Sequence, residues 1–169
     1  MHLSEGWRVL CVVLGLGHVV LCACGSESAC GPGAGVVSRV VDGDTLVLQS
    51  GERVRYLLVD TPESTGGKHE CFGAEARDFN RSLVEGRHVR LEYGEACTDR
   101  YGRLLAYVTV DGREVNTLLA EGGYACVLYV SPAGKSRRSE FEALESSARR
   151  AGRAGRGMWG QCSVVPCTR

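Results

Sequence analysis

The chain lacks a net charge, because its 20 Lys and Arg residues balance its 20 Asp and Glu residues. Without an overall field to draw the protein onto polyanions, any contact with nucleic acid depends on locally placed charge. The sequence also lacks the low hydrophobicity and high net charge of disordered chains, since 44% of its residues are hydrophobic. Its 169 residues are too few for a large multidomain protein. We expect one globular domain with short tails.

A long hydrophobic run is absent as well. The apolar stretch at residues 9–21, which follows Arg8, is too short to span a bilayer and is typical of a signal peptide. Residues 21–24 read LCAC and resemble the lipobox of bacterial lipoproteins. That resemblance implies a signal peptide at residues 1–23, a lipid on Cys24 and a membrane-anchored protein exported to the bacterial cell envelope. The alternatives are lipidation at Cys22 and an ordinary secretory signal that yields a secreted protein.

The cysteines indicate an oxidising compartment. Nine cysteines are too many for an ordinary reduced cytosolic domain of this length. Structural zinc is disfavoured, because no Cys-x-x-Cys pair follows residue 24 and the histidines there are His69 and His88. After loss of the signal peptide and lipidation of Cys24, an even set suited to disulfides remains, with fifteen pairings open. This set is Cys30, Cys71, Cys97, Cys126, Cys162 and Cys167.

Hydrophobic patterning predicts a small α+β barrel with no internal repeat. Residues 24–35 are rich in Gly and Ser and are expected to form a flexible spacer. Alternating apolar residues and turn signals predict strands at 36–41, 45–48, 53–59, 89–93, 104–110 and 125–130. Helical spacing and stop signals predict helices at 73–84, 115–121 and 139–150.

Carboxylates gather at the predicted strand ends. Asp42 and Asp44 join the first two strands, and Asp60 and Glu63 follow the third. Paired hard oxygen ligands of this kind suggest Ca²⁺ or Mg²⁺, although Asp-Gly-Asp taken alone favours a plain turn. Arg55 stands five residues before Asp60, and period-two alternation puts the two on opposite faces unless a bulge or twist intervenes. The spacing alone therefore does not place Arg55 in the site.

Four short segments carry a family resemblance through their order and spacing. They are residues 41–45 (VDGDT), 55–63 (RYLLVDTPE), 72–76 (FGAEA) and 99–103 (DRYGR). Together they resemble the staphylococcal nuclease (thermonuclease) family over residues 36–159. The resemblance implies an OB-fold, that is, a five-stranded Greek-key barrel with about three helices, whose open face binds single-stranded nucleic acid.

Roles follow from the resemblance position by position. It implies that Ca²⁺ binds the carboxylates of Asp44 and Asp60 and the backbone carbonyl of Thr61. Glu63 matches the carboxylate that orients or deprotonates the attacking water, and Arg55 and Arg103 match two arginines that clamp the phosphate. These residue types suit phosphodiester hydrolysis, which needs a cation and forked donors around an anionic phosphorus.

Further positions are expected to support the site. Asp42 and Asp99 are assigned to its periphery, and Tyr129 matches a tyrosine that lines the nucleotide pocket. Ser131 departs from the family pattern, because the best-known members carry a second pocket tyrosine there. His69 is expected to be a solvated loop residue.

The function predicted from the resemblance is that of a monomeric, Ca²⁺-dependent endonuclease, which hydrolyses DNA and RNA with little sequence choice and prefers single-stranded or unwound substrate. The alternatives are a non-catalytic nucleic-acid-binding OB-fold module and a structural envelope lipoprotein. The tail at residues 160–169 lies beyond the minimal family domain and is expected to be pinned by disulfides. We further hypothesise that Cys71 pairs with Cys97, which would join the loop after Glu63 to the segment before Arg103.

Overall fold

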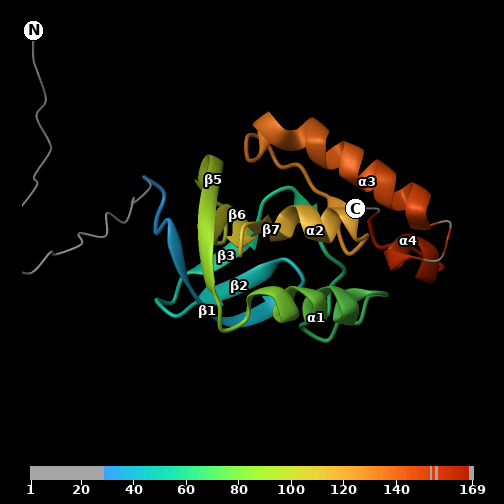
Figure 1. Cartoon of the computed structure of the whole chain (residues 1–169), viewed down its shortest axis with the longest axis horizontal. Helices are drawn as coiled ribbons and strands as arrows, with labels where there is room; N and C mark the ends of the chain where they lie inside the picture. Colours follow the sequence, from blue (N-terminus) through green and yellow to red (C-terminus); the bar gives the residue numbers. More distant parts are fainter. Residues whose placement is uncertain (1–28, 153, 155, 168–169) are drawn as a thin grey trace, which may run out of the picture.

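The computed structural model describes residues 29–152, 154 and 156–167 (Figure 1). The signal peptide predicted at residues 1–23 and the lipidation predicted at Cys24 lie outside these residues. Among the helices of the described part, none is long and apolar enough to cross a membrane.

In the described part of the chain, five strands close into a barrel. The hydrogen-bonded order is β3-β2-β1-β5-β6, and a parallel pairing of β3 with β6 closes the circle. The short β7 extends the sheet beyond β6, and β4 pairs with β8 beside the barrel. This closed Greek-key arrangement is the OB-fold that was predicted. The strands are β1 (Ala34–Asp42), β2 (Thr45–Leu48), β3 (Arg53–Tyr56), β4 (Val59–Asp60), β5 (His88–Thr98), β6 (Leu104–Val110), β7 (Arg113–Glu114) and β8 (Cys126–Val127).

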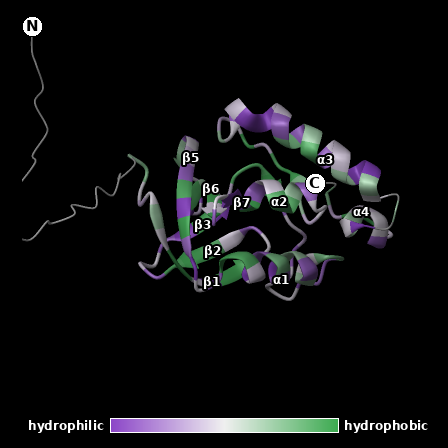
Figure 2. Ribbon diagram, in the orientation of Figure 1, coloured by the Kyte–Doolittle hydropathy of each residue, from purple (hydrophilic) through white to green (hydrophobic). Residues whose placement is uncertain are grey.

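The barrel interior follows the period-two rule of strands. Along β6, the alternate residues Leu104, Ala106, Val108 and Val110 are all buried. Figure 2 shows apolar residues concentrated in the barrel strands and on the inner sides of the helices. The core is therefore continuous from the barrel to the helices packed on it.

The helices cover the barrel on two sides (Figure 1). They are α1 (Gly73–Val84), α2 (Val115–Glu121), the 3-10 turn η1 (Lys135–Arg137), α3 (Arg138–Gly152) and α4 (Gly157–Gln161). α1 buries Ala76, Asn80, Leu83 and Val84, a helical stripe that packs toward β1. α3 packs on α2 and α4, and it buries Phe141, Ala148 and Gly152.

Most predicted elements are confirmed. The strands at 45–48 and 104–110 and the helices at 73–84 and 115–121 have the predicted bounds. The strand predicted at 53–59 is instead interrupted at Leu58, whose φ is 62°. The strand predicted at 125–130 shortens to β8, Cys126–Val127.

The prediction of a flexible spacer at residues 24–35 is wrong for its second half, residues 30–35. β1 begins at Ala34, before the expected domain boundary at residue 36. Cys30 is disulfide-bonded to Cys97, and the Tyr93 hydroxyl donates a 2.7 Å hydrogen bond to the Pro32 carbonyl. The segment from residue 30 onward therefore belongs to the folded domain.

Three disulfides join the cysteines of the described part of the chain, but not as hypothesised. Cys71 pairs with Cys162 and Cys97 with Cys30, so the predicted Cys71–Cys97 bond is wrong. The third disulfide joins Cys126 to Cys167. The chain after α4 folds back onto Phe72 and Cys126, which brings the tail cysteines beside Cys71 and Cys126. The tail is thus pinned by disulfides, as predicted.

Candidate active site

A break between β3 and β4 brings Arg55 and Asp60 to the same side of the chain. The left-handed backbone of Leu58 ends the regular alternation, and β4 restarts at Val59. Arg55 Nη2 then lies 2.8 Å from Asp60 Oδ1, and Arg55 Nη1 donates to the backbone carbonyls of Tyr56 and Val59. The buried guanidinium thus spans the break and fixes its geometry.

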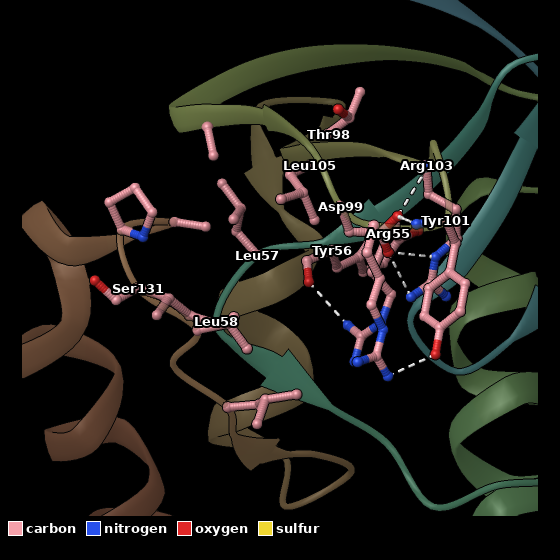
Figure 3. Close-up of a pocket in the computed structure, with 16 residues that line it drawn as sticks. Arg55, Tyr56, Leu57, Leu58, Thr98, Asp99, Tyr101, Arg103, Leu105 and Ser131 are labelled. Carbon is pink, nitrogen blue, oxygen red and sulfur yellow. Dashed lines mark hydrogen bonds and ion pairs between the residues drawn. The ribbon is translucent and has the colours of Figure 1, made fainter.

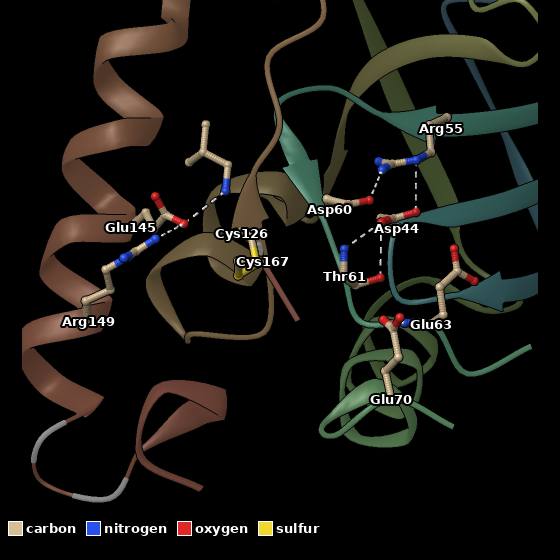
Figure 4. The surroundings of a disulfide bond; sticks show 11 residues. Asp44, Arg55, Asp60, Thr61, Glu63, Glu70, Cys126, Glu145, Arg149 and Cys167 are labelled. Atoms are coloured by element: carbon tan, nitrogen blue, oxygen red, sulfur yellow. Dashed lines mark hydrogen bonds and ion pairs between the residues drawn. A yellow bond between two sulfur atoms is a disulfide. The ribbon is translucent and has the colours of Figure 1, made fainter. Parts of the chain in front are cut away.

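Asp44 connects Arg55 to Thr61. It is 4% exposed, and its Oδ1 lies 3.1 Å from Arg55 Nε. Its Oδ2 accepts hydrogen bonds from the backbone N–H of Thr61 at 2.8 Å and from the Thr61 hydroxyl at 3.1 Å. Figure 4 shows Asp44, Asp60 and Thr61 facing one another beside Arg55. The turn between β1 and β2 and the end of β4 therefore meet through this one side chain.

Asn116 supports the same break from the other side. This buried side chain donates from Nδ2 to the Leu57 carbonyl at 3.0 Å and to the Ala106 carbonyl at 3.3 Å, and its Oδ1 accepts from the Val108 N–H at 2.9 Å. Sequence reasoning missed this role. A buried amide in the first turn of a helix that follows a strand is a weak signal, because its partners are backbone groups far apart in the sequence.

Asp99 holds Arg103. Its Oδ2 lies 2.7 Å from Arg103 Nη2 and 2.8 Å from Nε, while its Oδ1 accepts from the backbone N–H groups of Tyr101 and Arg103. Partial burial acts to raise the pKa of Asp99, but the hydrogen bonds from Arg103 and Tyr101 outweigh it and lower the pKa. Asp99 therefore stays ionised and fixes the Arg103 guanidinium at the rim of the site.

A polar cavity of about 110 Å³ lies at Asp44, Arg55 and Arg103. All the residues predicted for metal binding and catalysis line it, together with Asp42 and Pro62. They are Asp44, Arg55, Asp60, Thr61, Glu63 and Arg103. The cavity thus brings together acidic oxygens and guanidinium groups from four separate segments of the chain.

Negative charge is crowded in this cavity. Burial, followed by the charge of Asp44, raises the pKa of Asp42 to about 7. The Asp42 carboxylate accepts a 3.1 Å hydrogen bond from the backbone N–H of Asp44 and lines the same cavity. The charge of Asp44 contributes to the raised pKa of Asp42, and a bound cation would offset this repulsion.

A larger, mostly apolar cavity of about 450 Å³ adjoins the polar one. Arg55 and Arg103 line both cavities and stand at their junction. Figure 3 shows Arg55, Asp99, Tyr101 and Arg103 at one end of the larger cavity, with Leu58 and Ser131 toward the other. Tyr101 is 67% exposed, and the guanidinium groups of Arg100 and Arg103 lie over its ring. An aromatic face and apolar walls thus lie next to the arginines.

The pocket residues differ in part from those predicted. Ser131 lines the larger cavity as expected, but the neighbouring wall is made by Leu128 and Val130. Tyr129 packs against the core, and the Arg138 guanidinium lies 4.8 Å from its ring centre. Of the residues that the structure describes, neither Tyr129 nor the exposed His69 is among those lining either cavity.

The fold and this site define an OB-fold domain that carries a carboxylate-and-arginine centre at its barrel rim. The family model described as "Staphylococcal nuclease homologue" matches residues 53–161. The chain belongs to this family, as its motifs predicted.

Curated relatives agree with the assignment. The chain is 40% identical over 120 residues to the endonuclease YncB of Bacillus subtilis (strain 168). The matched region covers 67% of this chain and 56% of YncB. It is 37% identical over 107 residues to the thermonuclease of Staphylococcus intermedius, covering 60% and 64% of the two chains. It is 34% identical over 128 residues to the thermonuclease of Staphylococcus hyicus, covering 73% of each chain. The matched region thus spans little more than half of the first of these relatives.

Proposed function

We propose that this protein is a Ca²⁺-dependent nuclease that hydrolyses phosphodiester bonds in DNA and RNA with little sequence choice. The observation that carries the proposal is the convergence of three acidic side chains and two arginines on one polar cavity, namely Asp44, Asp60, Glu63, Arg55 and Arg103. The endonuclease and thermonuclease names of the relatives point to the same class.

The donor set suits a calcium ion. Asp44 and Asp60 offer carboxylates and Thr61 offers a backbone carbonyl, all of them the hard oxygen ligands that Ca²⁺ prefers. Four carboxyl groups and two guanidinium groups line the cavity, so its ionised side chains carry a net negative charge that a divalent cation would relieve. When bound, the cation supplies charge neutralisation at the scissile phosphate and acidifies a neighbouring water.

The chain's own residues supply the remaining chemistry. Glu63 orients the attacking water and accepts its proton as the water oxygen bonds to phosphorus. The opposite P–O bond breaks, and the departing oxygen takes up a proton from solvent water to become a hydroxyl group. Arg55 and Arg103 donate to the equatorial phosphate oxygens, whose negative charge grows in the transition state. Both guanidiniums are held by carboxylates, so little reorganisation is needed when the phosphate arrives.

The adjoining apolar cavity suits a nucleobase. Tyr101 offers an exposed ring for stacking, and the walls made by Leu128 and Val130 offer apolar contact without hydrogen-bond donors that select one base. Contacts to phosphate carry no sequence information. A base must be unstacked to enter this cavity, which favours single-stranded or unwound substrate.

Export is part of the proposal. The apolar stretch at residues 9–21 and the LCAC sequence support a signal peptide and a lipid on Cys24. The disulfides fit an oxidising compartment outside the cytoplasm. We expect a monomer that is anchored in the cell envelope, or secreted if Cys24 is not lipidated. Mass spectrometry of the N-terminal peptide distinguishes the two.

The central test follows cleavage of denatured DNA and of RNA by the purified, oxidised protein with Ca²⁺ and with excess chelator. We expect degradation that requires Ca²⁺, and a loss of at least roughly a hundredfold in Glu63→Gln and in Arg103→Ala. His69→Ala is the matched control and retains activity. A folded, calcium-supplied protein that binds but does not cleave nucleic acid is instead the non-catalytic binding module.

A further inference from the structure

Glu70 contacts the backbone of Glu63 twice. The Glu63 N–H donates a 2.8 Å hydrogen bond to Glu70 Oε2, and the Glu70 N–H donates a 3.0 Å hydrogen bond to the Glu63 carbonyl. Figure 4 shows the Glu70 carboxylate beside the backbone of Glu63. Glu70 is not among the described residues that line the polar cavity, and its two hydrogen bonds with Glu63 connect it to the site.

The start of α1 holds the same backbone from a second side. A Cβ at Gly73 would lie 2.7 Å from the Glu63 carbonyl oxygen and 3.0 Å from that of Pro62. The Gly73 N–H donates to the Glu70 carbonyl at 3.0 Å. Residues 70–73 therefore form a cradle, defined by these contacts, in which the main chain of Glu63 rests.

The cradle is covalently anchored. Cys71, next to Glu70, is bonded to Cys162 at the end of α4. α4 is itself held by the fully buried Met158, and the chain after it is held by the Cys126–Cys167 disulfide. The loop between Glu63 and Cys71 is otherwise exposed at residues 66–69, so few other contacts restrain it.

We propose that Glu70 is a positioning residue for Glu63, and that the Cys71–Cys162 disulfide keeps Glu70 in place. The proposal rests on the proposed function, in which Glu63 orients the attacking water. The Glu70 carboxylate fixes the main chain from which the Glu63 side chain projects, and a small misplacement of such a group costs turnover far more than substrate binding.

The first experiment compares Glu70→Ala with Glu70→Gln in the oxidised, calcium-supplied protein. Gln keeps an oxygen that accepts the Glu63 N–H, whereas Ala removes it. We expect kcat to fall roughly tenfold to a hundredfold in Glu70→Ala, with KM changed less than about threefold, and most of the kcat to return in Glu70→Gln. Glu75→Ala, which removes an exposed carboxylate from the first turn of α1, is the control and retains kcat.

A double-mutant cycle shows whether Glu70 acts through Glu63. In a Glu63→Gln background, Glu70→Ala is expected to cause no further loss of kcat, because the group that it positions is gone. Additive losses would overturn the proposal. A Glu70→Ala variant with wild-type kcat would also overturn the proposal. The nuclease assignment would still stand in that case, provided that the wild type cleaves and Glu63→Gln does not. A wild type without Ca²⁺-dependent cleavage overturns both.

Hydrogen exchange gives a readout that needs no activity. We expect the Glu63 amide to exchange at least tenfold faster in Glu70→Ala than in Glu75→Ala. Cys71→Ser/Cys162→Ser should accelerate the same amide and lower kcat, with near-native circular dichroism. Glu70→Ala should lower kcat by a smaller factor in the Cys71→Ser/Cys162→Ser background than in the wild-type background. Unchanged exchange and kcat in the disulfide variant would overturn the anchoring role.

Discussion

Leu58 and Gly134 are in direct contact, so close that a Cβ at residue 134 would lie 2.7 Å from Leu58 Cγ. Leu58 has a φ of 62°, and Gly134 a φ of 79°. Two residues with left-handed backbone conformations are thus in contact. One lies at the break between β3 and β4, and the other lies in the loop before η1 and α3. Because the break at Leu58 brings Asp60 to Arg55, the packing of Gly134 bears directly on the geometry of the site.

Gly134→Ala is therefore expected to destabilise the protein strongly. An L-residue with a left-handed backbone costs about 1 kcal/mol, and the overlap with Leu58 adds roughly 1–3 kcal/mol of overpacking. Urea denaturation measures the change. Gly86→Ala is the control, since Gly86 has a φ of 74° but nothing within 4 Å of its added Cβ. Equal losses in the two variants would show that the contact with Leu58 is unimportant.

Asn116→Ala is expected to weaken the same break. The substitution leaves the Val108 N–H and the Leu57 carbonyl buried without their side-chain partner, and each orphaned group costs roughly 1–3 kcal/mol. Urea denaturation should show a loss of about 3 kcal/mol. Thr117→Ala removes one half-buried hydrogen bond to Glu114 and should cost no more than about 1 kcal/mol. A loss in Asn116→Ala as small as that control would contradict the assigned role.

Local pattern was enough to predict most elements. The strand at 104–110 and the helix at 73–84 have the predicted bounds, because each has a clear hydrophobic period and a turn signal at its end. The motifs also predicted the residues of the polar cavity. The period-two rule alone put Arg55 and Asp60 on opposite faces, since nothing in the residues 57–59 (LLV) signals a left-handed leucine.

Features set by tertiary contacts were not predictable. Tyr129 lies beyond β8, which ends at Val127, and its neighbours Leu128 and Val130 line the larger cavity in its place. The pairing of Cys71 with Cys162 depends on how the tail folds back over Phe72, which no local period encodes. Such contacts join residues that are distant in the sequence.

Asp99→Asn is expected to slow cleavage by loosening Arg103. The substitution keeps the shape of the side chain but removes the charge that holds the Arg103 guanidinium. We expect kcat to fall about tenfold, less than in Arg103→Ala, because Arg103 remains present. Steady-state kinetics measure this. Asp111→Asn removes the same charge from an exposed turn and should leave kcat unchanged. In an Arg103→Ala background, Asp99→Asn should have little further effect, and an additive loss would contradict a role through Arg103.

Glu95 is expected to make the loop that carries Gly134 sensitive to acid. Its carboxylate accepts hydrogen bonds from the backbone N–H groups of Gly134, Lys135 and Ser136 at 2.8, 3.1 and 2.8 Å. Hydrogen bonds from its own backbone and from that of Ser136 lower the pKa of Glu95 from 4.5 to about 2. A pKa lowered by folding means that the ionised carboxylate stabilises the folded state. This contribution is fully present above about pH 4.5, and it is lost as the pH falls toward 2.

Comparison of Glu95→Gln with the wild type tests this dependence. The midpoint of urea denaturation should be lower in the variant at pH 6, and the difference should shrink steadily below pH 4.5 and vanish near pH 2. Because the carboxylate is exposed, added salt should reduce the difference at pH 6. Glu92→Gln removes an equal charge from an exposed position on the same strand and should change the midpoint little at either pH. A difference between Glu95→Gln and the wild type that stays constant from pH 6 to pH 2 would mean that the loop is held by neutral contacts, and that the Glu95 charge does not hold Gly134 against Leu58.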